Sequence, residues 1–192
     1  MTLVRDVVLT SIGYVFLLAA LGKIRHPLMF AMAIRNYQIL PDSIASLVAI
    51  VFIGIESFLA VAFLTRSLTR LAIPLAALTL VSFATAVGMN LRRKRPVACG
   101  CFGGDKEPIS GRSMARLLLL LLGVSYIWIV TANAGGFNAI PPIGARHVRY
   151  DLEVATSAVA LTLLGMWHLS IPELRSSITF GLRRIAPKES AL

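Results

Sequence analysis

The chain has 192 residues, of which 57% are hydrophobic and 15% charged, and its mean hydropathy is +0.79. Soluble domains contain about 45–50% apolar and about 25% charged residues, so this composition excludes a soluble domain. The length accommodates four or five helices of about 20 residues each. We therefore predict an all-α integral membrane protein whose residues 1–192 form one domain, a bundle of four to five transmembrane helices. The formal charge of +10 comes from basic residues that flank the apolar runs, which favours membrane topology over nucleic-acid binding.

The first predicted span is Val7–Leu21. With Arg5 before it and small residues near its end, this segment is similar to a signal peptide. Asp6 in the charged start and Lys23 directly after the apolar run do not fit that pattern. We therefore expect a retained helix.

The next apolar segment, Pro27–Leu40, differs from a span because it carries Arg35 near its middle and ends at Pro41. A short apolar segment with an internal charge is typical of a helix that lies at the membrane surface. We expect it to be an amphipathic or re-entrant segment rather than a transmembrane helix.

The second predicted span, Ile44–Leu64, contains a carboxylate, Glu56, near its middle. A lone carboxylate is costly in lipid, so Glu56 must be protonated or face the bundle interior with a partner. Two interpretations stay open at this point. Glu56 could accept a proton when a thiol or a quinone changes redox state, or it could be a protonated group that bridges two helices.

The third predicted span, Leu71–Met89, leads into a turn that holds the only two cysteines of the chain, Cys99 and Cys101. Cysteines two residues apart can bring their Cα atoms within the roughly 4.4–6.8 Å that a disulfide tolerates, and the glycine between them lets the backbone bend. Such a disulfide would be strained, and strained disulfides are labile and exchange readily.

Basic residues surround this turn, with Arg92–Arg95 before it and Lys106 after it. Their positive field favours the thiolate, which is the form that exchanges disulfides and binds soft metals. The alternative is a pair of reduced, inert thiols in a tight turn. The spacing favours a redox or metal-binding role.

The last two predicted spans are Leu117–Ala132 and Val154–Leu169. The segment 133–151 between them is rich in glycine and proline, which excludes regular helix over most of its length. His147 in this segment stands beside two arginines and is typical of a solvated loop residue. No phosphate-binding loop and no Ser/His/Asp pattern occurs in the chain.

Alternating five spans across the membrane places 14 of the 19 basic residues on one side, which the positive-inside rule makes cytoplasmic. The turn at Cys99 would then face the cytoplasm and the N-terminus the outside. A single dithiol on the cytoplasmic side has no second cysteine pair with which to exchange electrons across the membrane. Three alternatives therefore stay open: the turn faces the periplasm, it reaches a quinone within the membrane, or the protein works as a subunit with a partner.

Several motifs together resemble the MauE family of methylamine utilisation membrane proteins, which is related to DoxX. The resemblance covers about the first two thirds of the chain, and its most specific element is the turn that contains both cysteines. The matching residues are Gly22-Lys23, Pro27, Phe30, Tyr37, Leu40-Pro41, Glu56 and Cys99-Gly100-Cys101-Phe102-Gly103.

This resemblance implies a factor in the bacterial inner membrane that helps methylamine dehydrogenase to mature, since the small subunit of that enzyme is exported and rich in disulfides. It implies a thioredoxin-like partner of the MauD type. Cys99 and Cys101 would be the redox pair and Glu56 a supporting group inside the membrane. A quinone is a candidate cofactor, and the chain would be a thiol-disulfide oxidoreductase or an accessory subunit of one.

Two other functions remain alternatives. Two thiolates suit a soft ion such as Cu(I) or a zinc-like metal, but they fill only half of a tetrahedral site, so Met89 and His168 would have to contribute. No dedicated metal site is predicted from the sequence. In the other alternative, the chain is a membrane scaffold for a partner and uses no thiol chemistry.

Overall fold

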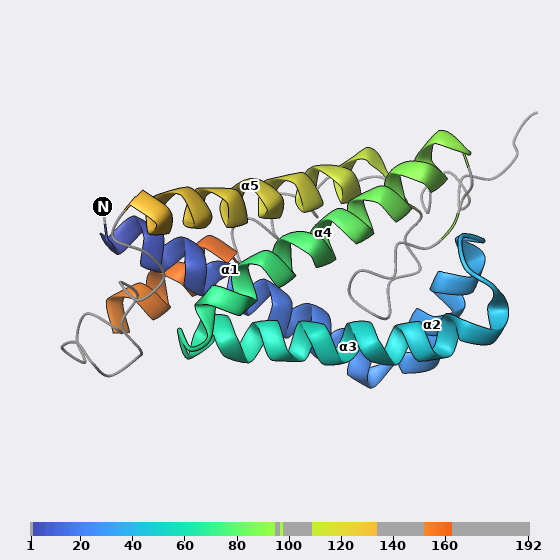
Figure 1. The fold of residues 1–192 in the computed structure, drawn as a ribbon, viewed down its shortest axis with the longest axis horizontal. Helices are drawn as coiled ribbons and strands as arrows, with labels where there is room; N and C mark the ends of the chain where they lie inside the picture. The colour runs from blue at the N-terminus through green and yellow to red at the C-terminus, as the bar shows by residue number, and fades with distance from the viewer. Residues whose placement is uncertain (1, 95–96, 98–108, 134–151, 163–192) are drawn as a thin grey trace, which may run out of the picture.

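The computed structural model describes residues 2–94, 97, 109–133 and 152–162, and all regular structure within these ranges is helical (Figure 1). This confirms the predicted all-α fold class. The labelled helices follow one another along the chain: α1 (Thr2–Arg25), α2 (Pro27–Asn36), α3 (Asp42–Leu64), α4 (Thr69–Arg92) and α5 (Gly111–Asn133). A shorter helix, Leu152–Thr162, comes after them.

Four of these helices are long and apolar enough to cross a membrane: α1 from Leu3 onwards, α3, α4 and α5. At about 1.5 Å per residue, each exceeds the roughly 30 Å thickness of the hydrocarbon core. The chain is therefore a multi-pass membrane protein. A shorter apolar helix, Leu152–Thr162, falls within the predicted fifth span, and the remaining residues of that span lie outside the described ranges.

The outward faces of the bundle are apolar, as a lipid environment requires. Ile50, Leu119 and Leu122 are each more than 60% exposed. The core between the helices contains the fully buried side chains of Leu59 and Phe63 from α3. Both the inside and the lipid-facing outside are therefore built from apolar residues.

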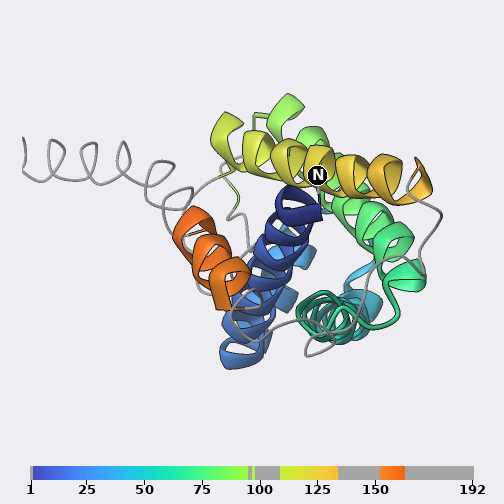
Figure 2. The ribbon, with the colours of Figure 1, turned by 90° about the vertical axis from the view of Figure 1, so that its left-hand side faces the viewer.

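Helix α1 is the central element, since it packs against α3 on one side and α5 on the other, and the helix Leu152–Thr162 also lies beside it (Figure 2). Glycine at position 13 allows the close approach to α3, because a Cβ there would lie 3.1 Å from carbon atoms of Phe63 and Leu64. Nearby, the rings of Phe16 and Phe63 stack with a centroid distance of 6.1 Å.

Helix α2 continues the path of α1 after a break at His26. Pro27 begins the new helix, where its missing N–H costs no hydrogen bond. Phe30 and Ala31 of α2 pack against Ala49, in the first half of α3. Thus α1 contacts the second half of α3, α2 contacts the first half, and the break between them lies beside the middle of α3.

Candidate functional site: a buried ion pair at the helix break

Glu56 faces the interior of the bundle and pairs with Lys23. The Nζ atom of Lys23 lies 2.6 Å from Oε1 and 2.7 Å from Oε2 of Glu56. The two side chains are only 1% and 3% exposed. The sequence analysis expected Glu56 to be either protonated or paired in the bundle interior. The structure places it beside Lys23, 33 residues earlier at the end of α1.

Two aromatic rings surround the ammonium group of Lys23. Its Nζ atom lies 5.0 Å from the ring centroid of Phe30 on α2 and 5.1 Å from that of Phe83 on α4. A cation over aromatic faces gains further electrostatic stabilisation when it is removed from water. Residues from α1, α2, α3 and α4 therefore meet at this one charged group.

The ion pair lies deep within the length of α3. Glu56 follows the first residue of α3 by 14 positions and precedes the last by 8. At the helical rise, these separations correspond to about 21 Å and about 12 Å. Charged side chains at such depth are rare, and they mark functional sites or precise helix contacts.

Asn90 lies near the end of α4 that leads to the cysteine turn, and it is fully buried. Its Nδ2 atom donates a hydrogen bond to the carbonyl oxygen of Ala86 at 3.0 Å. Among the residues that the structure describes, its Oδ1 atom has no hydrogen-bond partner. The Nδ2 group of this buried amide is hydrogen-bonded, whereas its oxygen can accept a hydrogen bond from a neighbouring segment or a bound molecule.

Cys99 and Cys101 lie outside the described residues, but both flanks of their segment are described. The backbone N–H of Ile109 donates a hydrogen bond of 2.8 Å to the carbonyl oxygen of Val97. Ile109 is buried in the core cluster and Val97 packs against it. Val97 and Ile109, the described residues on either side of the segment 98–108, therefore lie together against the bundle core.

A second buried charge cluster lies at the opposite end of α1. The Nε atom of Arg5 is 3.0 Å from one oxygen of Asp6, and Nη1 of Arg66 is 3.9 Å from the other. Asp6 is fully buried, and the two arginines are no more than 4% exposed. The sequence analysis missed this cluster, because it treated Asp6 only as an exception to a signal-peptide pattern. The close succession of Arg5 and Asp6 at the start of an apolar helix was the available signal.

Of the four residues that the metal alternative required, Cys99, Cys101 and His168 lie outside the described residues. Within the described ranges, no three His, Cys, Asp or Glu side chains come together. Met89 is 36% exposed near the end of α4.

A family model for the methylamine utilisation protein MauE matches residues 1–129. The chain belongs to the MauE family. It is 36% identical over 154 residues to the methylamine utilization protein MauE of Paracoccus denitrificans, a match that covers 79% of this chain and 80% of that protein. It is 30% identical over 182 residues to the MauE protein of Methylorubrum extorquens, with 89% and 90% covered. No solved structure matches the chain.

The MauE match confirms the family resemblance predicted from the sequence motifs. It extends from the start of α1 to near the end of α5 and includes Lys23, Glu56, Cys99 and Cys101. The ion pair and both cysteines are thus contained in the part of the chain that matches the family model.

Proposed function

We propose that this chain is a bacterial inner-membrane factor of methylamine utilisation, which supports maturation of the disulfide-rich small subunit of methylamine dehydrogenase. The observation that carries this proposal is the MauE family match over residues 1–129. Both curated relatives are named as methylamine utilization proteins. Apolar transmembrane helices, rather than alternating strands, are typical of inner-membrane proteins, which supports this location.

The proposed chemistry is thiol-disulfide exchange at Cys99 and Cys101. A disulfide across one glycine is strained, so it would exchange readily with the thiols of a client or of a thioredoxin-like partner of the MauD type. The contact between Val97 and Ile109 supports this role, because it anchors both ends of the cysteine segment to the bundle core. An anchored turn would present its two sulfur atoms at a defined place to a partner.

Glu56 would act in this mechanism as a positioning residue. Through Lys23 it joins the end of α1 to α3, and through the rings of Phe30 and Phe83 the pair contacts α2 and α4. Helix α4 leads directly to the cysteine turn. Loss of the pair would therefore alter the placement of the turn without touching either sulfur atom.

Thiol trapping in growing cells tests the redox proposal. We expect Cys99 and Cys101 to change from a maleimide-reactive to an unreactive state when reductant is withdrawn and to become reactive again when it is restored.

Cys99→Ser and Cys101→Ser should each abolish maturation of the dehydrogenase small subunit while the protein remains in the membrane at its normal level. Ser110→Cys in a cysteine-free background serves as a control thiol near the same helix end. A pair that never changes state, or a functional double serine variant, would refute the exchange mechanism and favour a scaffold.

The side of the membrane that the turn faces can be measured with an impermeant thiol reagent. From the distribution of basic residues, we expect the reagent to miss Cys99 and Cys101 in intact cells and to label them after permeabilisation. A reporter fused after Leu192 should then be active in the cytoplasm. Labelling in intact cells would reverse the predicted orientation and would allow direct exchange with an exported client.

A further inference from the structure

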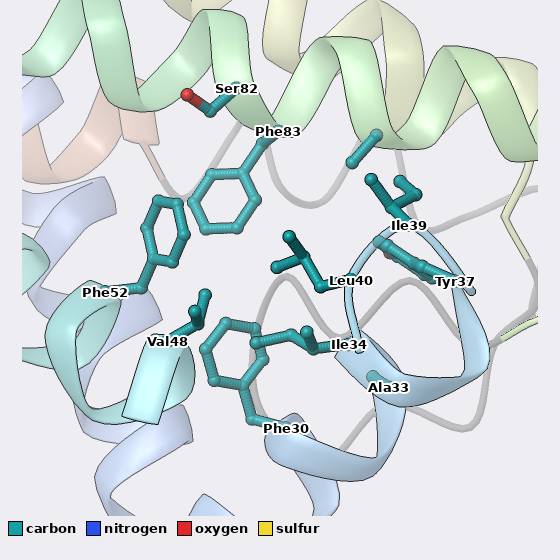
Figure 3. A pocket seen from close by; sticks show the side chains of 11 residues that line it. Phe30, Ala33, Ile34, Tyr37, Ile39, Leu40, Val48, Phe52, Ser82 and Phe83 are labelled. Carbon is teal, nitrogen blue, oxygen red and sulfur yellow. The ribbon is translucent and has the colours of Figure 1, made fainter. Parts of the chain in front are cut away.

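An apolar cavity of about 170 Å³ lies between α2, α3 and α4 (Figure 3). Four of its lining residues are aromatic: Phe30, Tyr37, Phe52 and Phe83. Phe30 and Phe83 are also the rings that contact the ammonium group of Lys23. The cavity therefore shares a wall with the buried ion pair, within the length of the transmembrane helices.

The size of the cavity matches one six-membered ring. An engineered apolar protein cavity of about 150 Å³ binds benzene, so the volume here accommodates a single substituted ring. The rings of Phe52 and Phe83 lie 4.9 Å apart at an interplanar angle of 37°, and those of Phe30 and Phe83 lie 6.5 Å apart at 58°. Such tilted rings offer both faces and edges to another planar ring, which a saturated acyl chain does not exploit.

The lining also contains two hydroxyl-bearing side chains, Tyr37 and Ser82. Burial raises the pKa of Tyr37 to about 12, so its hydroxyl group keeps its proton well above neutral pH. The hydroxyl group of Ser82 donates to the carbonyl oxygen of Leu78 at 2.8 Å and is directed away from the enclosed space (Figure 3). Tyr37 therefore gives this otherwise apolar lining a phenolic hydroxyl group.

We infer that this cavity binds the ring of a lipid-soluble quinone. Its aromatic wall and the phenolic Tyr37 fit a planar ring that carries oxygen substituents, and its place between helices long enough to span a membrane suits a ligand that is dissolved in the bilayer.

The use of this quinone as an oxidant rests on the proposed function, whereas its binding does not. Oxidation of a dithiol to a disulfide forms one S–S bond and releases two electrons and two protons. Reduction of a quinone to the quinol takes up two electrons and two protons, so the step balances without any other reagent. Helix α4 lines the cavity with Phe83 and Ala86 and then leads to the cysteine turn.

Titration of the purified full-length protein in detergent micelles with decylubiquinone tests the inference. We expect saturable binding that raises the Tm of the protein. Decanol has the same tail length but no ring, so it should compete with an affinity at least about tenfold lower than that of decylubiquinone. Ala86→Phe fills the cavity and should weaken binding about tenfold or more. Ile39 also lines the cavity, but its side chain is 39% exposed. The larger ring of Ile39→Phe should therefore also weaken binding, without disturbing the packing of the interior.

Val81→Phe is the matched control, because Val81 is 46% exposed on the same helix and does not line the cavity. It should bind decylubiquinone like the unmodified protein.

Equal competition by decanol would identify an acyl-chain site and overturn the inference. Unchanged binding in folded Ala86→Phe and Ile39→Phe variants would also overturn it. Binding that persists in the Cys99→Ser/Cys101→Ser variant would support the cavity independently of the thiol mechanism. Loss of thiol cycling with intact binding would count against the proposed function alone.

Discussion

Replacing Glu56 by glutamine should lower the free energy of unfolding by about 3–5 kcal/mol, the cost typical of removing one partner from a buried ion pair. The substitution keeps the size of the side chain but removes the carboxylate that Lys23 contacts at 2.6 and 2.7 Å. The ammonium group would then remain in the bundle interior without that compensating charge. Unfolding of the purified protein by increasing SDS, followed by circular dichroism, measures the loss.

The double variant Lys23→Met/Glu56→Leu separates a stabilising role from a functional one. Removing both charges eliminates their desolvation cost, so we expect most of the lost stability to return, to within about 1–2 kcal/mol. Asp42→Asn, the equivalent substitution at an exposed carboxylate, should change stability by less than about 1 kcal/mol. A Glu56→Gln variant as stable as the control would contradict a charged pair. A double variant that regains stability but not client maturation would assign the pair a role beyond packing.

The sequence predicted where along the chain the transmembrane helices lie, but not the residues at which they begin. Hydropathy located an apolar run at Val7–Leu21, whereas α1 begins at Thr2. The difference arises because Arg5 and Asp6 contact each other inside the bundle, so their charges do not end the helix. Similarly, α5 begins at Gly111 rather than Leu117, since Arg112 and Arg116 lie within its first turns. Hydropathy places the end of a span at the charges that flank an apolar run, whereas here these flanking charges are part of the helices.

The candidate site was predictable only in part. The position of Glu56 in an apolar span implied a buried partner, but nothing local selects Lys23 over the other basic residues. That choice depends on the break at His26 and on α2, which bring the end of α1 beside the middle of α3. The cavity depends on three helices at once and had no sequence signal. The cysteine pair, in contrast, was evident from spacing alone, and its chemistry remains a prediction.

Replacing Asp6 by asparagine should lower the free energy of unfolding by about 3–5 kcal/mol, by the same physical argument applied at the other end of α1. Asp6 is fully buried, and its carboxylate contacts the guanidinium groups of both Arg5 and Arg66. The variant would retain two buried positive groups and lose the negative group between them. Because Arg66 lies in the turn between α3 and α4, that turn should also exchange its amide hydrogens faster with deuterium.

Asp42→Asn is the matched control, since Asp42 is exposed in the first turn of α3 and interacts mainly with the helix dipole. It should cost less than about 1 kcal/mol. Amide exchange around Arg66 and Leu68 should stay unchanged in this control. These two residues have positive φ angles of 55° and 52°, a strained backbone conformation that the Arg66–Asp6 contact helps to hold. If Asp6→Asn left both stability and exchange in this turn unaltered, the cluster would be a consequence of the helix packing and not one of its causes.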